Sequence, residues 1–205
     1  MKVLMINGSP HAAGSTYTAL HAMEEVFEKE GIETELIQIG HLDIRGCTAC
    51  GFCKRHKKCV YNDIVNEIAA KLEQADGFVV GTPVYYASCN STITAMMDRL
   101  FYSHGFDTTM KVGASVVSAR RGGLSASMDQ LNKYFSISGM PIASSTYWND
   151  IHGNDAAQAS QDLEGLRTMR NLAHNMSFLI KSISLGKEQF GLPEKEPRVS
   201  TNFIR

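Results

Sequence analysis

The alternation of strand-like and helix-like segments constrains the fold of this chain more than any other feature of the sequence. Five short segments have the apolar or alternating pattern of β-strands, and longer amphipathic segments follow them. The expected strands are 2–6, 33–39, 78–82, 112–118 and 141–147, and the expected helices are 15–30, 62–74, 90–103, 125–138 and 157–185. Strands separated by helices pair in parallel, because parallel neighbours require long crossover connections. The sequence therefore predicts an α/β fold, a doubly wound five-stranded parallel sheet with helices on both faces.

Length and composition fit one globular domain. The chain has 205 residues, of which 43% are hydrophobic and 20% charged, and it can bury a full core. We expect a domain over 1–185, with a cysteine-rich loop at 43–61, and an extended C-terminal tail over 186–205. A net charge of −1 gives no reason to expect nucleic acid or a membrane as partner. The sequence shows neither an apolar stretch of 18 residues nor a signal-peptide pattern, so a cytoplasmic location is expected.

The loop after the first strand, within residues 7–18, is rich in glycine and hydroxyl side chains and opens a helix. A helix N-terminus presents unpaired N–H groups and a positive dipole end, which together bind anions such as phosphate. The loop contains no Lys or Arg, which excludes a GxxxxGK[ST] triphosphate site. Gly8 and Gly14 stand six apart without a third glycine, which excludes a dinucleotide fingerprint. A pocket for one phosphate monoester remains, with an ordinary tight turn as the alternative.

The loops after the other strands complete a candidate flavin site. In a doubly wound sheet the ligand lies beyond the carboxyl ends of the strands, so these loops should meet. Residues 82–88, TPVYYAS, offer apolar walls and free backbone groups to an isoalloxazine ring. Residues 118–123, SARRGG, combine glycines with two cationic side chains that suit a reduced flavin. Each loop alone could be packing or a solvated turn, but their coincidence at one sheet edge favours a flavin site.

Three motifs, in this order and at these intervals, resemble those of the NAD(P)H-dependent FMN reductase family of flavodoxin-like proteins. They are NGSPHAAGSTYTAL, GTPVYYASCNSTITAMMDRL and SARRGG, and the resemblance runs from Met1 to about Leu185. It implies one residue group for the phosphate and ribityl chain of FMN, a second for the flavin ring and a third for the opposite ring edge. These groups are, in order, Ser9, His11, Ser15, Thr16 and Tyr17; Pro83, Val84, Tyr85, Tyr86 and Ser88; and Ser118, Arg120, Arg121, Gly122 and Gly123.

One position departs from the family pattern. His11 stands where family members commonly carry Arg, so the cation beside the phosphate is only partly present at neutral pH. The resemblance also implies a homodimer or homotetramer with flavins near the interface. Trp148 and His152 could line that interface, although packing within their own loop is the preferred interpretation.

Four of the five cysteines lie within thirteen residues and form a second candidate site. Cys47, Cys50, Cys53 and Cys59 have the spacing C-x2-C-x2-C-x5-C. Two successive CxxC steps followed by a fourth cysteine resemble ferredoxin-type ligation more than paired zinc knuckles. The motif also resembles that of the iron-sulfur flavoproteins, a branch of the same group, which implies a 4Fe-4S cluster. Free thiols and a zinc site are the alternatives, and Cys89 is expected to be a small packed residue.

Two functional classes follow from these sites. The first is an FMN-dependent oxidoreductase that takes hydride from NAD(P)H and passes electrons to a flavin, quinone or other acceptor, with the cluster as a further carrier. The second is a non-enzymatic electron carrier that acts between protein partners. Flavodoxins tend to be strongly acidic, whereas this chain is nearly neutral and has an Arg-Arg loop at the expected flavin site. The enzyme is therefore the favoured interpretation, although no catalytic proton donor is identified.

Overall fold

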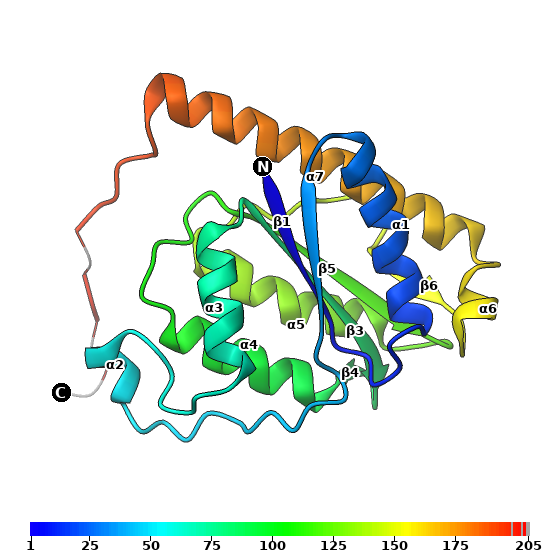
Figure 1. Ribbon diagram of the computed structural model, residues 1–205, viewed down its shortest axis with the longest axis horizontal. Coiled ribbons are helices and arrows are strands. Elements are labelled where there is room, and N and C mark those ends of the chain that lie inside the picture. The colour runs from blue at the N-terminus through cyan, green and yellow to red at the C-terminus, as the bar shows by residue number, and fades with distance from the viewer. Residues whose placement is uncertain (198, 202, 204–205) are drawn as a thin grey trace.

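The computed structural model describes residues 1–197, 199–201 and 203, and it places a parallel sheet between two layers of helices (Figure 1). The strands are β1 (Lys2–Asn7), β2 (Glu33–Gln38), β3 (Gly77–Tyr85), β4 (Ser88–Cys89), β5 (Val112–Ala119) and β6 (Asp150–His152). The helices are α1 (Ser15–Lys29), α2 (Phe52–His56), α3 (Ile64–Gln74), α4 (Ser91–Ser103), α5 (Leu124–Ile137), α6 (Ala156–Ala159) and α7 (Leu163–Phe190).

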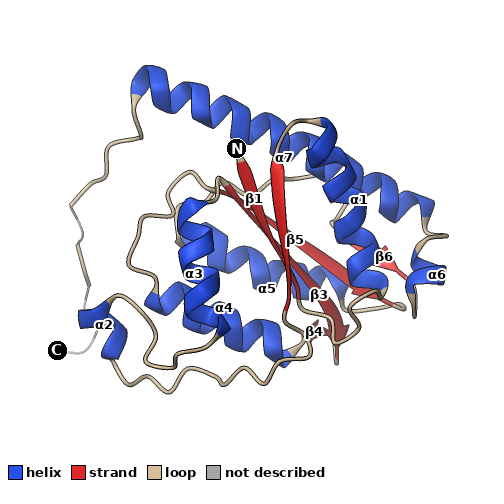
Figure 2. Cartoon of the chain, in the orientation of Figure 1, coloured by secondary structure: helices blue, strands red, loops and turns tan. Residues whose placement is uncertain are grey.

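The sheet has the doubly wound topology that the sequence predicts. Its strand order is β2-β1-β3-β5-β6, all parallel, and the two-residue strand β4 pairs antiparallel with the end of β3 (Figure 2). The connection from β1 leads outward to β2, whereas the next one returns past β1 to β3. The strand order therefore reverses between β1 and β3, the position where ligands bind in such sheets.

Both faces of the sheet are covered, which explains why its central strands are continuously apolar. Val3 and Met5 of β1 pack in the layer with α1 and α7, whereas Leu4 and Ile6 pack in the layer with α3, α4 and α5. Alternate side chains of a strand point to opposite faces, so a strand between two helix layers needs apolar residues at every position. All four side chains are fully buried.

The predicted fifth strand is wrong in position. Within 141–147 only Ile142 forms a bridge, to Gly113, whereas the ladder with β5 forms at Asp150–His152. Pro141 has no N–H to donate to a ladder. The polar residues that follow bond to α7 instead, because Ser145 Oγ donates to the Thr168 carbonyl at 2.6 Å and the Ser144 carbonyl accepts from Asn175.

The long predicted helix over 157–185 is two helices. Asp162 accepts a hydrogen bond from the Gly165 amide at 2.9 Å and caps a new helix, which separates α6 from α7. Helix α7 continues to Phe190, where Gly191 at φ 76° ends it. The tail therefore begins at 191 and not at 186; its residues 198, 202 and 204–205 lie outside the described residues.

The described helices include none whose length and apolar content would allow it to cross a membrane.

Gly40, which follows β2, lies against the loop after β1. A Cβ atom at this position would be 2.0 Å from the Ser9 carbonyl oxygen and 2.4 Å from that of Gly8. Both neighbours are backbone atoms, which cannot move aside as a flexible side chain can. This glycine therefore sets how closely the two loops approach.

We expect Gly40→Ala to lower the free energy of unfolding by about 1–3 kcal/mol, because the added methyl group overpacks a rigid backbone contact. Gly186→Ala is the matched control. It lies within α7, where a Cβ would meet nothing within 4 Å, and it should stabilise the protein by about 0.5–1 kcal/mol. Urea denaturation of both variants measures the difference, and similar changes in both would contradict the role given to Gly40.

Candidate functional site

The last residues of β3 and β5 and the loops after β1, β5 and β6 meet at the carboxyl edge of the sheet and line a cavity of about 710 Å³. Residues 83–85, predicted to lie in a loop, are the end of β3. This volume is in the usual range for small-molecule sites. Nine of the fifteen residues predicted to bind FMN line it: Ser9, His11, Ser15, Thr16, Pro83, Val84, Tyr85, Ser118 and Arg120. The structure thus brings together residues that lie more than a hundred positions apart in the chain.

The other six predicted residues lie outside the lining of this cavity. They are Tyr17, Tyr86, Ser88, Arg121, Gly122 and Gly123. Tyr86 is fully exposed at the turn between β3 and β4, and the Ser88 hydroxyl donates to Gln130 Oε1 at 2.8 Å. Tyr17 stacks on His21 along α1, with ring centroids 5.5 Å apart. A contact of any of these residues with a bound ligand stays a prediction.

The phosphate end of the predicted site is held by short bonds within its own loop. Asn7 Oδ1 accepts from the Ser9 amide at 3.0 Å, and Ser9 Oγ accepts from the His11 amide at 3.1 Å. Helix α1 begins at Ser15, and the residue before it, Gly14, has no side chain that could cap the first turn. The N–H groups of that turn are therefore available to an anion.

Two hydroxyl groups of α1 join the walls of the cavity. Ser15 Oγ lies 3.1 Å from the carbonyl oxygen of Gly153 and 3.0 Å from that of Asp155, so its single hydrogen is shared between these two acceptors of the loop after β6. Thr16 Oγ1 lies 2.8 Å from Ser118 Oγ at the end of β5. Both side chains were predicted to hold the FMN phosphate and ribityl chain, and the structure shows that they also fix the loops around the cavity.

Two parts of the site go beyond the sequence prediction. The loop after the last strand was expected at this edge as residues 146–153, but β6 lies later in the chain than predicted, so the cavity wall there is formed by Gly153 together with Asn154 and Asp155, which were not expected. Asn90 is buried, and its Nδ2 donates to the Gly8 carbonyl while its Oδ1 accepts from the Ile93 amide at 3.0 Å. An Asn before a helix signals a cap, but only the fold shows that this cap also holds the loop after β1.

The SARRGG glycines have a structural role of their own. Gly123 precedes α5 at φ 90°, and a Cβ there would lie 2.6 Å from Cα of Ala87. Ala87 and Tyr86 form the turn between β3 and β4 with φ of 60° and 50°, the left-handed conformation that two-residue hairpin turns require. Gly123 therefore permits close packing on this turn, whereas Gly122 has open space around it.

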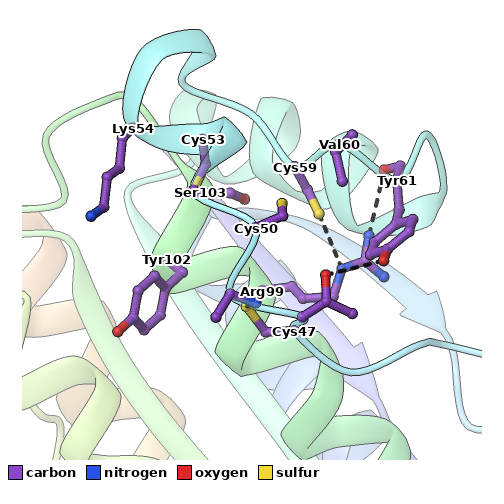
Figure 3. Close-up of a pocket in the computed structure, with 13 residues that line it drawn as sticks. Cys47, Cys50, Cys53, Lys54, Cys59, Val60, Tyr61, Arg99, Tyr102 and Ser103 are labelled. Carbon is purple, nitrogen blue, oxygen red and sulfur yellow. Dashed lines mark hydrogen bonds between the residues drawn. The ribbon is translucent and has the colours of Figure 1, made fainter.

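The four clustered cysteines line a second cavity, of about 230 Å³, together with Arg99, Tyr102 and Ser103 of α4 (Figure 3). Cys47 and Cys50 are exposed, Cys53 and Cys59 are half-buried, and all four are free thiols. No three His, Cys, Asp or Glu side chains of the described residues converge closely enough to hold a metal ion. The 4Fe-4S cluster therefore stays a prediction, supported by the donor set and its shared cavity.

Two polar side chains of α4, Arg99 and Ser103, line the cysteine cavity. Arg99 Nε donates to Cys59 Sγ at 3.2 Å, and its two terminal nitrogens each bond to Asp63 at 2.7 Å. Burial opposes the charge of Arg99, but the bonds to Asp63 and Cys59 outweigh burial and raise its pKa. Ser103 is also buried, and within the described structure its hydroxyl has no hydrogen-bond partner. Because buried hydroxyl groups normally have a hydrogen-bond partner, the unpaired Ser103 hydroxyl beside four thiols is consistent with a cavity that binds a sulfur-containing group.

Cys89, the fifth cysteine, lies in neither cavity lining. It is buried, and its thiol donates to the Ser127 carbonyl at 3.3 Å. Burial raises the pKa of this thiol to about 11, so the thiol stays protonated at neutral pH. This environment agrees with a packed residue and leaves the thiol poorly nucleophilic.

The sequence is similar to a family of flavin reductases and to iron-sulfur flavoproteins. The sequence model of a family described as NADPH-dependent FMN reductase matches residues 1–155. An iron-sulfur flavoprotein of Methanocaldococcus jannaschii is 32% identical over 191 residues, which cover 89% of this chain and 99% of that protein. An iron-sulfur flavoprotein of Methanosarcina thermophila is 29% identical over 194 residues, which cover 92% and 100%.

Solved structures confirm the flavodoxin-like fold. RosB, solved with the bound intermediate 8-demethyl-8-formylriboflavin-5'-phosphate, aligns with a TM-score of 0.70 at 16% identity, covering 100% of this chain and 94% of RosB. An archaeal flavodoxin aligns with a TM-score of 0.61 at 15% identity, covering 88% and 99%. At these low sequence identities, the structural similarity shows a shared fold and nothing more.

Ser15→Ala should loosen the loop after β6, because the carbonyls of Gly153 and Asp155 lose their shared donor. We expect the free energy of unfolding to fall by about 1 kcal/mol and amide exchange within 153–157 to accelerate, measured by urea denaturation and hydrogen-exchange mass spectrometry. Ser125→Ala, at an exposed position of α5, is the matched control. Unchanged exchange in Ser15→Ala would show that this hydroxyl does not hold the loop.

Proposed function

Because the chain belongs to the NADPH-dependent FMN reductase family, we propose that it is an FMN-dependent oxidoreductase that uses NAD(P)H as hydride donor. The observation that carries the proposal is that nine residues predicted to contact FMN, from the loops and strand ends at the carboxyl edge of the sheet, line one cavity. When bound there, FMN would accept hydride and pass electrons to a flavin, quinone or other acceptor. Residues of this chain would bind the phosphate and orient the flavin ring.

Binding of the phosphate falls to the loop after β1 and the first turn of α1. The free N–H groups after Gly14 supply donors and the positive end of the helix dipole. Ser9 and His11 lie in the same cavity lining and would add a hydroxyl and an imidazole. Residues 7–18 contain no Lys or Arg, so the backbone N–H groups would supply most of the attraction for the phosphate.

The last residues of β3 and the loop after β5 would orient the flavin ring. Pro83, Val84 and Tyr85 form an apolar wall with a rigid entry, since proline restricts the backbone. Arg120 follows β5 and brings a guanidinium group to the lining of the cavity. A guanidinium in this place would stabilise an anionic reduced ring relative to the neutral oxidised one.

We further propose that Cys47, Cys50, Cys53 and Cys59 hold a 4Fe-4S cluster. Relatives named iron-sulfur flavoproteins that align over most of the chain support this assignment, as do the four thiols of one cavity and the orphaned Ser103 hydroxyl. A cluster would add one-electron chemistry to the two-electron chemistry of FMN. The homodimer or homotetramer expected from the family stays a prediction that light scattering can test.

Flavin binding and reduction test the main proposal. Protein incubated with excess FMN should retain about one FMN per chain, and NADH or NADPH should bleach its visible absorbance under anaerobic conditions. Absence of flavin bands after gel filtration would refute FMN binding. Failure of both nucleotides to reduce a flavin that dithionite does reduce would instead favour the electron carrier.

Iron analysis tests the cluster. Anaerobically reconstituted protein should contain about four irons and four sulfides per chain, and Cys59→Ser should lose most of this iron. Cys89→Ala is the matched control, because Cys89 lies outside the cysteine cavity, and it should keep the full complement. Negligible iron in the wild type, with four titratable surface thiols, would leave free thiols as the correct assignment.

A further inference from the structure

Arg99 of α4 connects both ends of the cysteine loop through every N–H group it has. Its side chain is fully buried. Nε donates to Cys59 Sγ at 3.2 Å, Nη1 to Asp63 Oδ2 at 2.7 Å and to the Arg45 carbonyl at 3.2 Å, and Nη2 to Asp63 Oδ1 at 2.7 Å and to the Tyr61 carbonyl at 3.4 Å. A guanidinium has five N–H donors, so its hydrogen-bonding capacity is completely used.

This arrangement fixes the loop before any group is bound in it. Arg45 lies two residues before the first clustered cysteine, and Asp63 lies four residues after the last. Asp63 also caps α3, because its Oδ1 accepts from the Val65 amide at 3.1 Å. One buried side chain therefore ties both ends of the loop to α4 and α3, and the exposed thiols of Cys47 and Cys50 lie between these anchored ends.

Ser103 lies one helical turn after Arg99 on the same helix and lines the same cavity. It is 3% exposed, and within the described residues its hydroxyl has no partner. Serines inside helices commonly donate to the carbonyl four residues earlier, as Ser177 does to Ala173 at 2.8 Å in α7. Ser103 makes no such bond in the described structure, so its hydroxyl is a donor available to a group in the cavity.

We propose that Arg99 and Ser103 are positioning residues that donate hydrogen bonds to the sulfur atoms of the cluster site and raise the reduction potential of a cluster held there. The proposal rests on the cluster of the proposed function. Reduction adds one electron to the cluster and makes its sulfur atoms more negative, so N–H and O–H donors stabilise the reduced form more than the oxidised form. No proton is transferred, because Arg99 remains protonated and Ser103 keeps its hydroxyl hydrogen.

Ser103→Ala separates this role from a structural one, because its two expected effects have opposite signs. Without iron, the variant should be at least as resistant to thermal unfolding as the wild type, since it loses an unpaired buried hydroxyl. With the cluster, the one-electron reduction equilibrium constant should fall about threefold in an anaerobic potentiometric titration followed by electron paramagnetic resonance. Ser136→Ala, at an exposed position of α5, should leave both quantities unchanged.

Arg99→Lys keeps the charge but removes the forked donors. We expect the same equilibrium constant to fall about tenfold, which corresponds to about 59 mV for one electron. Arg170→Lys, at an exposed position of α7, is the matched control. FMN content reports whether the variant has folded, because the two cavities have no lining residue in common.

A measurement on unmutated protein covers the case in which Arg99→Lys does not fold. Wild-type protein labelled with 15N only in the guanidinium group of arginine should show a 15N nucleus coupled to the reduced cluster in pulsed electron paramagnetic resonance. The Nε–H to Sγ bond predicts this coupling. Its absence would overturn the role of Arg99.

The outcomes separate the two proposals. A wild type that binds no cluster refutes the cluster of the proposed function, and this inference fails with it. A wild type that binds the cluster, with potentials unaltered in both variants, refutes the inference alone. Lower potentials in both variants, with the iron-free Ser103→Ala protein unimpaired, support it.

Discussion

The pairing of β1 with β2 on one side and β3 on the other determines where the rest of this molecule lies. β1 is buried on both faces, so a helix layer must cover each of them. The connection from β1 leads to β2 on one side, and the connection from β2 returns past β1 to β3 on the other side, so the strand order reverses next to β1. The ends of β3 and β5 and the loops after β1, β5 and β6 line the larger cavity at that edge.

Helix α4 connects the two candidate sites. At its start, Asn90 caps the helix and donates to the Gly8 carbonyl in the phosphate loop. At its end, Arg99 and Ser103 form the floor of the cysteine cavity. The face between them is buried through Ile93, Met96 and Leu100, which keeps the helix fixed in the core. Helix α4 thus contributes Arg99 and Ser103 to the cysteine cavity and, through its capping residue Asn90, holds the loop after β1 that lines the larger cavity.

Much of the fold could be predicted because its signals are local and repeated. Strands β1, β2, β3 and β5 and helices α1, α3, α4 and α5 follow from hydrophobic period and from glycine or cap positions within one to three residues, whereas the short elements α2 and β4 were not predicted. The errors after Ser138 have two causes. Residues 144–146 hydrogen-bond to α7 instead of β5, and Asp162 starts a new helix. The bonds to α7 join positions 23 to 31 apart in the chain, and the start of α7 depends on one capping residue, so hydrophobic periodicity could reveal neither.

The sequence by itself determined the layered α/β architecture, the phosphate loop and the spacing of the four cysteines, because each depends on neighbouring residues along the chain. Only the tertiary structure decided which side chains share a cavity. It brought Gly153 and Asp155 to Ser15, across 138 and 140 positions, and placed Arg99 against Cys59, across 40 positions. Such contacts form because buried polar groups must find partners wherever the packed helices and strands place them. Their partners are therefore set by the geometry of the whole fold and not by local sequence.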